Sequence, residues 1–251
     1  MITCNITYYN EPAWLHWWYR TFKQLHEDGV PFTLAVGDDG SQKEPAEKFF
    51  AKYKPLPNMK LYKVTEDIGF NSHGTRNLLM KQTDTEWNML SDIDRHYSID
   101  TFKYLIRNVT TFKPQHYYSF KEKIIASPDG FSVNEYLVRK NDFWKTGGYD
   151  EEFVNIHWGD RLFLETLKRI CKRVLLPEHC FVKYVRKSRE VRWENVEKTT
   201  YPDDYTLIHP NDRWPDQEFR FELKKRIAER NKTPEGRLSK KVINFEWEQV
   251  F

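Results

Sequence analysis

Two aspartates near the middle of the chain have the residue type and spacing that metal-assisted chemistry needs. Asp92 and Asp94 follow residues 87–90, a short apolar run typical of a buried strand. While the chain stays extended, residues two apart point to one face, so both carboxylates would lie side by side and repel each other unless a cation separates them. Oxygen ligands suit Mg²⁺ or Mn²⁺, and a metal held by few carboxylates commonly also binds substrate phosphates. The pair therefore predicts a metal site, with an acidic surface turn as the alternative.

The elements that must position this pair alternate between strand and helix. Strands are expected at residues 2–8, 32–36, 59–64 and 87–90, and helices at 14–26, 45–53, 72–81 and 99–109. This alternation predicts an α/β fold with a mostly parallel central sheet and helices on its faces. Polar or glycine-rich turns follow the four strands, at 9–12, 37–41, 66–70 and 91–94. Ligands bind at the carboxyl ends of strands in such sheets, so we expect these turns to share one site.

The rest of the chain is expected to complete this domain and to add an extension. Further strands are expected at 116–120, 131–138 and 174–176, with helices at 141–146 and 161–171. Beyond about residue 190 the pattern weakens into a loop-like stretch followed by a helix at 219–230. We therefore expect one domain over residues 1–190 and a helical and loop-like C-terminal extension, packed on it, over 191–251.

Composition and cysteine usage are those of an intracellular globular protein. Of the 251 residues, 39% are hydrophobic and 31% are charged, which is enough apolar material for one large domain. Cys4, Cys171 and Cys180 are too few for a disulfide framework, which favours a reducing compartment. No apolar run has the length of a membrane span, and the N-terminus has no signal-peptide pattern. We therefore expect a cytoplasmic protein with no transmembrane segment, and no obligate protein partner is evident.

Positive charge is concentrated in the C-terminal third, although the formal net charge is only +3. Lys and Arg outnumber Asp and Glu within residues 168–192 and again within residues 222–241. This part of the chain could face an anionic partner. A solvated helix surface explains the second stretch equally well.

Five groups of short motifs follow one another along roughly residues 2–190. They are Tyr9-Asn10-Glu11; Asp38-Asp39-Gly40-Ser41; Asp67-Ile68-Gly69 with Gly74-Thr75-Arg76-Asn77; Ser91-Asp92-Ile93-Asp94; and residues 147–153 followed by Trp158-Gly159-Asp160. In this order they resemble the motifs of the family 2-like glycosyltransferases of the GT-A fold, which is Rossmann-like. The last group is especially similar to the acceptor segment of β-1,4-galactosyltransferases. The resemblance implies an enzyme that moves a sugar from a nucleotide-diphosphate sugar, with UDP as the expected nucleotide, to an acceptor hydroxyl.

The resemblance also implies which residues act on the donor side. Nucleotide contacts are expected from Tyr9, Glu11, Asp38, Asp39, Arg76 and Asp92. Within this set, the acid of the Asp38-Asp39 turn would accept a hydrogen bond from the base, and Arg76 would pair with a phosphate or the base. Asp92 and Asp94 would hold Mn²⁺ or Mg²⁺, which neutralises the leaving diphosphate as a Lewis acid.

On the acceptor side, the resemblance implies that Asp160 is the general base that takes the proton of the attacking hydroxyl. Trp158 would stack its flat apolar face on the acceptor. Further acceptor contacts are expected from Gly148, Arg186, Lys187 and Arg189. A single base opposite a metal-held leaving group implies an inverting displacement, so an α-linked donor would give a β-linked product. The alternatives are a helix N-cap for Asp160 and core packing for Trp158.

Two departures from the family pattern bear on these roles. The family usually has a Glu-Asp pair after its Trp-Gly, whereas here Asp160 stands alone and Arg161 follows it. Galactosyltransferases have a metal-binding histidine in a basic stretch where this chain has Lys187. A third metal ligand is therefore expected from His179 or His209, or is absent.

Two other functions are compatible with parts of this pattern. A nucleotidyltransferase could share the sheet and the paired acids, but it would usually show a basic glycine-rich phosphate loop, which residues 8–12 are not. A non-catalytic nucleotide-sugar-binding module is disfavoured by the intact Asp92, Asp94 and Asp160. The acceptor is expected to be a surface glycan or a hydroxymethylated base in phage DNA. In the second case Lys and Arg between 183 and 192 would contact phosphates beside an extruded base.

Overall fold

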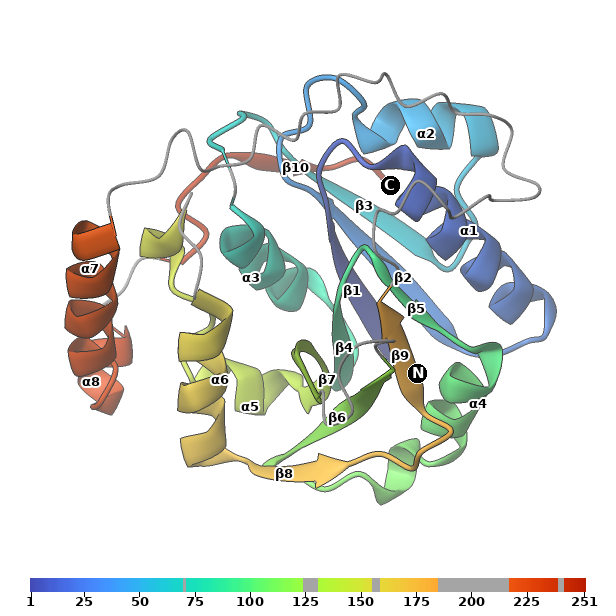
Figure 1. Ribbon diagram of the computed structural model, residues 1–251. Helices are drawn as coiled ribbons and strands as arrows, with labels where there is room; N and C mark the ends of the chain where they lie inside the picture. The colour runs from blue at the N-terminus through green and yellow to red at the C-terminus, as the bar shows by residue number, and fades with distance from the viewer. Residues whose placement is uncertain (70, 124–130, 155–158, 185–216, 239–241) are drawn as a thin grey trace.

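The computed structural model describes residues 1–69, 71–123, 131–154, 159–184, 217–238 and 242–251 (Figure 1). Among these residues, ten strands form one sheet in the order β10-β3-β2-β1-β4-β7-β6-β9-β5, with β8 paired to β6. The strands are β1 (Ile2–Tyr8), β2 (Phe32–Asp38), β3 (Met59–Val64), β4 (Trp87–Asp92), β5 (Arg95–Tyr97), β6 (His116–Lys123), β7 (Phe131–Arg139), β8 (Lys172–Leu175), β9 (Phe181–Tyr184) and β10 (Trp247–Gln249). The helices are α1 (Pro12–Glu27), α2 (Ala46–Tyr53), α3 (Ser72–Gln82), α4 (Ile99–Arg107), α5 (Lys140–Lys145), α6 (Gly159–Ile170), α7 (Gln217–Arg230) and α8 (Pro234–Leu238), with short 3₁₀ turns η1 (Val109–Thr111) and η2 (Glu151–Phe153).

The N-terminal half forms the parallel part of the sheet. β1 lies at its centre because it pairs in parallel with β2 and β4, and β2 pairs in parallel with β3. Side chains alternate between the two faces, so Leu34 and Val36 enter the core beneath α1, α2 and α4, whereas Ala35 enters the core beneath α3. The predicted α/β fold, with a mostly parallel central sheet flanked by helices, is therefore confirmed.

The second half adds antiparallel strands beside β4. β4 pairs antiparallel with β7, and β7 pairs antiparallel with β6. β5 and β9, which the sequence pattern did not indicate, pair with each other at the far edge of the sheet. β4 continues to Asp92, and Ile93 and Asp94 form the turn that leads into β5. The extended geometry considered for the aspartate pair therefore ends at Asp92, because the chain must turn before β5 can pair with β9.

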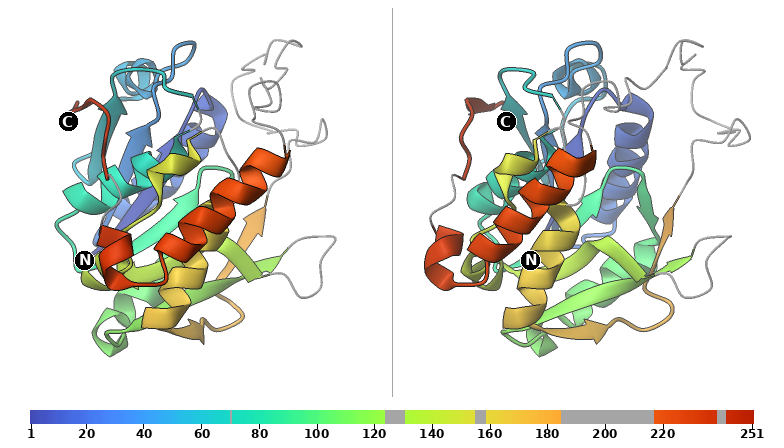
Figure 2. Two further views of the ribbon diagram at one scale, coloured as in Figure 1. Left: turned by 90° about the vertical axis from the view of Figure 1, so that its left-hand side faces the viewer. Right: turned by 60° about the vertical axis from the view of Figure 1, so that its left-hand side comes forward.

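Near the C-terminus, Trp247–Gln249 form the strand β10 at one edge of the sheet. β10 pairs antiparallel with β3, with Trp247 opposite Val64, and the Val250 amide donates to the Leu61 carbonyl at 2.9 Å. α7 lies alongside α6 (Figure 2). The sequence pattern missed β10 because three residues are too short for a periodic signal. Within the described part of the chain, no helix has the length and apolar character needed to cross a membrane.

One glycine sets how closely α3 approaches the carboxyl end of β2. A Cβ at Gly37 would lie 2.4 Å from the Thr75 Cγ2 atom, so only glycine lets the helix pack directly on the strand at this point. This contact fixes the N-terminal half of α3, which carries Arg76, against the ends of the parallel strands.

Candidate active site

Hydrogen bonds from buried side chains hold the turn from Asp92 to Asp94 in place. The indole Nε1 of Trp18, whose side chain is fully buried on α1, donates to the Ile93 carbonyl at 2.8 Å. The Ser91 and Tyr97 hydroxyls share a hydrogen bond of 3.0 Å, which ties the end of β4 to β5. The turn therefore has little freedom to change the positions of its two carboxylates.

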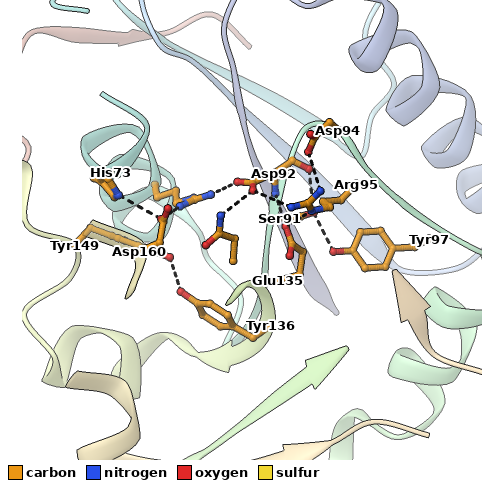
Figure 3. A network of polar contacts seen from close by, with 12 residues as sticks. His73, Ser91, Asp92, Asp94, Arg95, Tyr97, Glu135, Tyr136, Tyr149 and Asp160 are labelled. Atoms are coloured by element: carbon orange, nitrogen blue, oxygen red, sulfur yellow. Dashed lines mark hydrogen bonds and ion pairs between the residues drawn. The ribbon is translucent and has the colours of Figure 1, made fainter. Parts of the chain in front are cut away.

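Arg76 connects the two candidate catalytic regions. Its side chain on α3 is only 2% exposed, and its guanidinium forms ion pairs with the carboxylates of Asp92 and Asp160. The guanidinium carbon also lies 5.3 Å from the centre of the Tyr149 ring, a cation–π contact. Asp92 receives a further hydrogen bond of 2.9 Å from Asn134 Nδ2. Asp92 and Asp160, both labelled in Figure 3, therefore bind the same guanidinium.

Asp160 lies in the first turn of α6 and is held in its ionised form. Burial raises its pKa, but the Arg76 guanidinium and the His73 ring lower it by more, so the net pKa is well below the ordinary value. His73 Nε2 lies 3.3 Å from Asp160 Oδ1. Its side chain is 27% exposed. A carboxylate stabilised in this way is a weak base as long as the Arg76 pair persists.

Arg95 and Glu135 form a second ion pair behind the turn, which the sequence analysis missed. Glu135 on β7 is completely buried, and its Oε1 accepts a hydrogen bond of 2.9 Å from Arg95 Nε. The two terminal nitrogens of Arg95 lie 3.6 Å from Asp94 and 3.9 Å from Asp92. The signal available in the sequence was a lone glutamate beside the apolar residues 136–138 of an expected strand.

Asp94 has fewer of the polar contacts described for the turn than Asp92, which contacts Arg76, Arg95 and Asn134. Burial and the nearby charge of Asp92 raise its pKa to about 6, against the opposing effect of Arg95 and with a small contribution from Glu11. Its side chain is 31% exposed, and Arg95 is its ion-pair partner. Two close carboxylates, both partly exposed, are a donor set that fits a divalent cation shared with a substrate phosphate.

The structure does not bring His179 to this pair. Its exposed ring packs edge-on against Tyr104 of α4, at 5.0 Å between centroids. In the ranges described, no group of three or more His, Cys, Asp or Glu side chains is placed to share a metal ion. His209, the other candidate ligand, lies outside the described residues.

The two aspartates after β2 are engaged by the protein itself. Asp38 accepts from the backbone nitrogens of Ser41 at 2.9 Å and Ala46 at 2.7 Å, so it closes the turn and caps α2. Asp39 accepts from the Thr75 hydroxyl and the Asn71 amide, both at 2.8 Å, and burial raises its pKa to about 8. Asp38 thus holds the loop that joins β2 to α2, and Asp39 ties that loop to the start of α3, whichever ligand the loop binds.

Tyr9 and Glu11 lie at the carboxyl end of β1, as expected. Tyr9 is 41% exposed, and its hydroxyl donates to Asp67 Oδ2 at 3.0 Å, which joins the turns after β1 and β3. Glu11 precedes α1 and lies near enough to Asp94 to influence its pKa. The turns after these strands therefore do meet at one edge of the sheet.

Gly148 is a backbone position that requires glycine. Its φ is +73°, and a Cβ there would lie 2.6 Å from Asn77 Oδ1. Asn77 accepts from the Tyr149 amide at 2.8 Å and donates to the Tyr149 carbonyl at 2.9 Å. The remaining acceptor residues predicted from the sequence lie outside the described residues; they are Trp158, Arg186, Lys187 and Arg189.

Comparison with known proteins gives structural neighbours only. No family model and no curated protein matches the sequence. Staphylococcus aureus TarS 1–349 in complex with UDP-GlcNAc matches with a TM-score of 0.69 and 14% identity, over 92% of this chain and 66% of that chain. The same fragment in complex with UDP matches with a TM-score of 0.61 and 15% identity, over 72% and 59% of the two chains. The chain thus spans less than two thirds of these TarS structures.

The fold is that of GT-A glycosyltransferases. At 14% identity the likeness concerns the fold alone, and it confirms the fold that the motifs predicted. The similarity of residues 147–153 to β-1,4-galactosyltransferases stays a prediction.

Proposed function

We propose that this chain is a glycosyltransferase that moves a sugar from a nucleotide-diphosphate sugar, with UDP as the expected nucleotide, to an acceptor hydroxyl. The main support is the geometry of the site: the buried Arg76 joins Asp92 and Asp160, which are far apart in sequence, at the carboxyl ends of the strands. The fold supports this, because its TarS neighbours were solved in complex with UDP and UDP-GlcNAc. These features favour sugar transfer over nucleotidyl transfer, and the intact acids favour an enzyme over a binding module.

Asp94 and Asp92 are the residues that would hold Mn²⁺ or Mg²⁺. Asp94 is partly exposed, and Asp92 lies close enough to raise its pKa, so a cation between them would relieve their repulsion. When bound, such an ion would supply Lewis-acid stabilisation of the leaving diphosphate. Few protein ligands are expected, because Mg²⁺ sites of this kind keep positions for water and substrate phosphate.

Asp160 is our candidate for the general base, and its ion pair with Arg76 must change for it to act. A donor diphosphate near the buried Arg76 guanidinium would compete with Asp160 for that cation. The Asp160 pKa would then rise toward its ordinary value, which strengthens it as a base when the donor is in place. With the base on one side and the leaving group on the other, the displacement would invert the anomeric centre.

The function is tested by calorimetric titration of the protein with UDP and UDP-GlcNAc in Mn²⁺, followed by a screen of labelled nucleotide sugars against several acceptors. The acceptors are surface-type glycans and duplex DNA containing hydroxymethylated bases. Saturable binding of at least one nucleotide sugar and transfer to one acceptor class support the proposal. Absence of binding to every nucleotide sugar in the set contradicts it.

The acceptor class can be read from the salt dependence of a triple variant. For a DNA acceptor, replacing Arg186, Lys187 and Arg189 by Ala should raise the acceptor Michaelis constant and flatten its salt dependence by about one unit of slope per lost phosphate contact. Donor hydrolysis should be spared. For a neutral glycan, the triple variant should change neither quantity appreciably.

The matched control for this experiment removes three exposed cations elsewhere on the surface. Lys23, Lys48 and Lys54 are exposed on α1, on α2 and just after α2. Their replacement by Ala makes the same change in net charge. A salt dependence that is equally flattened by both triple variants would rule out a local DNA contact at residues 186–189.

A further inference from the structure

Arg230, at the end of α7, forms ion pairs with two acids at the start of η2. Its guanidinium contacts the carboxylates of Asp150 and Glu152. Asp150 is only 3% exposed, so this pair is largely shielded from water. The buried Asn231 side chain approaches the same Asp150 carboxylate at 3.5 Å. Loss of the cation would leave a buried carboxylate without its main partner, which is the most costly way to break such a pair.

The side chain of Glu151, which lies between these two acids in the sequence, binds backbone amides of the C-terminal segment, residues 242–251. Its carboxylate accepts from the Ile243 amide at 2.6 Å and from the Asn244 amide at 3.1 Å. The same carboxylate accepts from Asn77 Nδ2 at 2.8 Å. Asn77 follows Arg76 on α3, so the C-terminal segment is linked to the helix that carries the central cation of the site.

Apolar packing continues this connection toward α6. Leu223 and Ile227 of α7 form one buried cluster with Phe153 of η2 and Leu162 of α6. α7 therefore contacts both the 3₁₀ turn that Arg230 holds and α6, the helix whose first turn carries Asp160. The ion pairs of Arg230 add polar contacts to this small apolar cluster at the end of the same helix.

The last link runs through His73 to the candidate base. The Phe153 ring lies edge-on to the His73 ring at 6.3 Å, and His73 Nε2 lies 3.3 Å from Asp160 Oδ1. A Cβ at Gly159 would lie 2.7 Å from the His73 ring, so the helix start and the ring are in direct contact. A shift of η2 would therefore reach the Asp160 carboxylate.

We propose that Arg230 is a positioning residue for Asp160. By holding Asp150 and Glu152 it fixes η2, and η2 with His73 fixes the carboxylate at the start of α6. The inference rests on the proposed function, in which Asp160 is the base. It assigns Arg230 to turnover and not to donor binding, because its ion-pair partners Asp150 and Glu152 lie outside the turns after β1 and β2 that are expected to bind the nucleotide.

The test compares two identical substitutions one turn apart on α7. Arg230→Met removes the pair with Asp150, whereas Arg226→Met, at an exposed position, serves as the control. Arg230→Met should lower the transfer rate constant by about 10-fold or more, since small displacements of catalytic groups have effects of that size. The Kd for UDP should stay within about threefold of wild type, as in the control. Arg230→Lys should recover part of the rate, because lysine keeps the charge but lacks the fork that spans two carboxylates.

Hydrogen exchange of the α6 amides gives a second measurement that does not depend on activity. Exchange in the first turn of α6 should be faster in Arg230→Met and unchanged in Arg226→Met. If wild type transfers no sugar, the proposed function fails while the exchange comparison still tests the positioning. The proposal is overturned if Arg230→Met transfers as fast as the control, if its affinity for UDP falls as much as its turnover, or if exchange in α6 is unaffected.

Discussion

Replacing Asp160 by Asn is expected to lower the transfer rate constant by about 10²-fold or more, while the Kd for UDP changes little. The substitution keeps the shape of the side chain and one acceptor oxygen for Arg76, but it removes the basicity that proton abstraction requires. Initial rates with saturating donor and acceptor, together with calorimetric binding of UDP, measure the two effects separately.

The control for this variant is another acidic residue in the first turn of a helix. Asp100 is exposed in the first turn of α4, so Asp100→Asn removes the same favourable charge at a helix N-terminus without touching the site. If Asp160→Asn lowers the melting temperature and leaves turnover at the level of Asp100→Asn, Asp160 has only a structural role at the helix start.

The pH dependence of Asp160 follows from its low pKa. Burial raises the pKa, but Arg76 and His73 lower it more, so the folded-state value lies below that of the unfolded chain. The ionised group therefore adds stability above the unfolded pKa of about 3.9, and this stability is lost as the pH falls through the lower folded value. In the free enzyme, loss of activity between about pH 5 and 7 would have to come from a different group.

Removing the metal site should have an effect of similar size. Asp94→Asn, or excess chelator with the wild-type protein, is expected to lower transfer by about 10²-fold or more, because the charge that develops on the diphosphate is no longer neutralised. Direct binding of Mn²⁺ in the presence of UDP, followed by electron paramagnetic resonance, should weaken in the variant. Mn²⁺ is expected to support activity at least as well as Mg²⁺.

Asp84→Asn is the matched control for the metal experiment. Asp84 precedes β4 at the opposite end from the turn, and its side chain is 78% exposed and paired with Lys60. The control should bind Mn²⁺ and transfer sugar like wild type. Full activity in excess chelator, with Asp94→Asn also fully active, would show that the turn carboxylates do not hold a required metal.

The sequence determined the elements of the parallel half and the edge of the sheet at which the site forms. Apolar runs of strand length alternate with helical periodicity, and a polar turn follows each run, so the turns after β1, β2, β3 and β4 had to meet at one edge. Asp92, Asp160 and Arg76 were identified from motifs of local sequence. Such features are readable because residue type and short spacing are enough to specify them.

Only the tertiary structure decided which partner each charged side chain takes. Arg76, expected on the nucleotide, pairs with Asp92 and Asp160 at sequence separations of 16 and 84 residues. Asp38 and Asp39 bind their own loop and α3. The sequence does not show which charged residues will pair, because pairing depends on which elements the topology brings within hydrogen-bonding distance. Such pairs interact strongly in the interior, where the dielectric constant is low.

Dependence on tertiary contacts also explains why Glu135, β10 and Arg230 were not predicted from the sequence. Glu135 sits in the middle of a strand, at a position that would equally suit an exposed side chain, and burial arises only when Arg95 and the turn after β4 cover it. β10 has three residues, too few for a period, and it forms because the open edge of β3 offers backbone partners. Arg230 resembles any solvated arginine of a helix until α7 places it against the buried Asp150. Local pattern thus determined the scaffold, and long-range packing determined the electrostatics of the site.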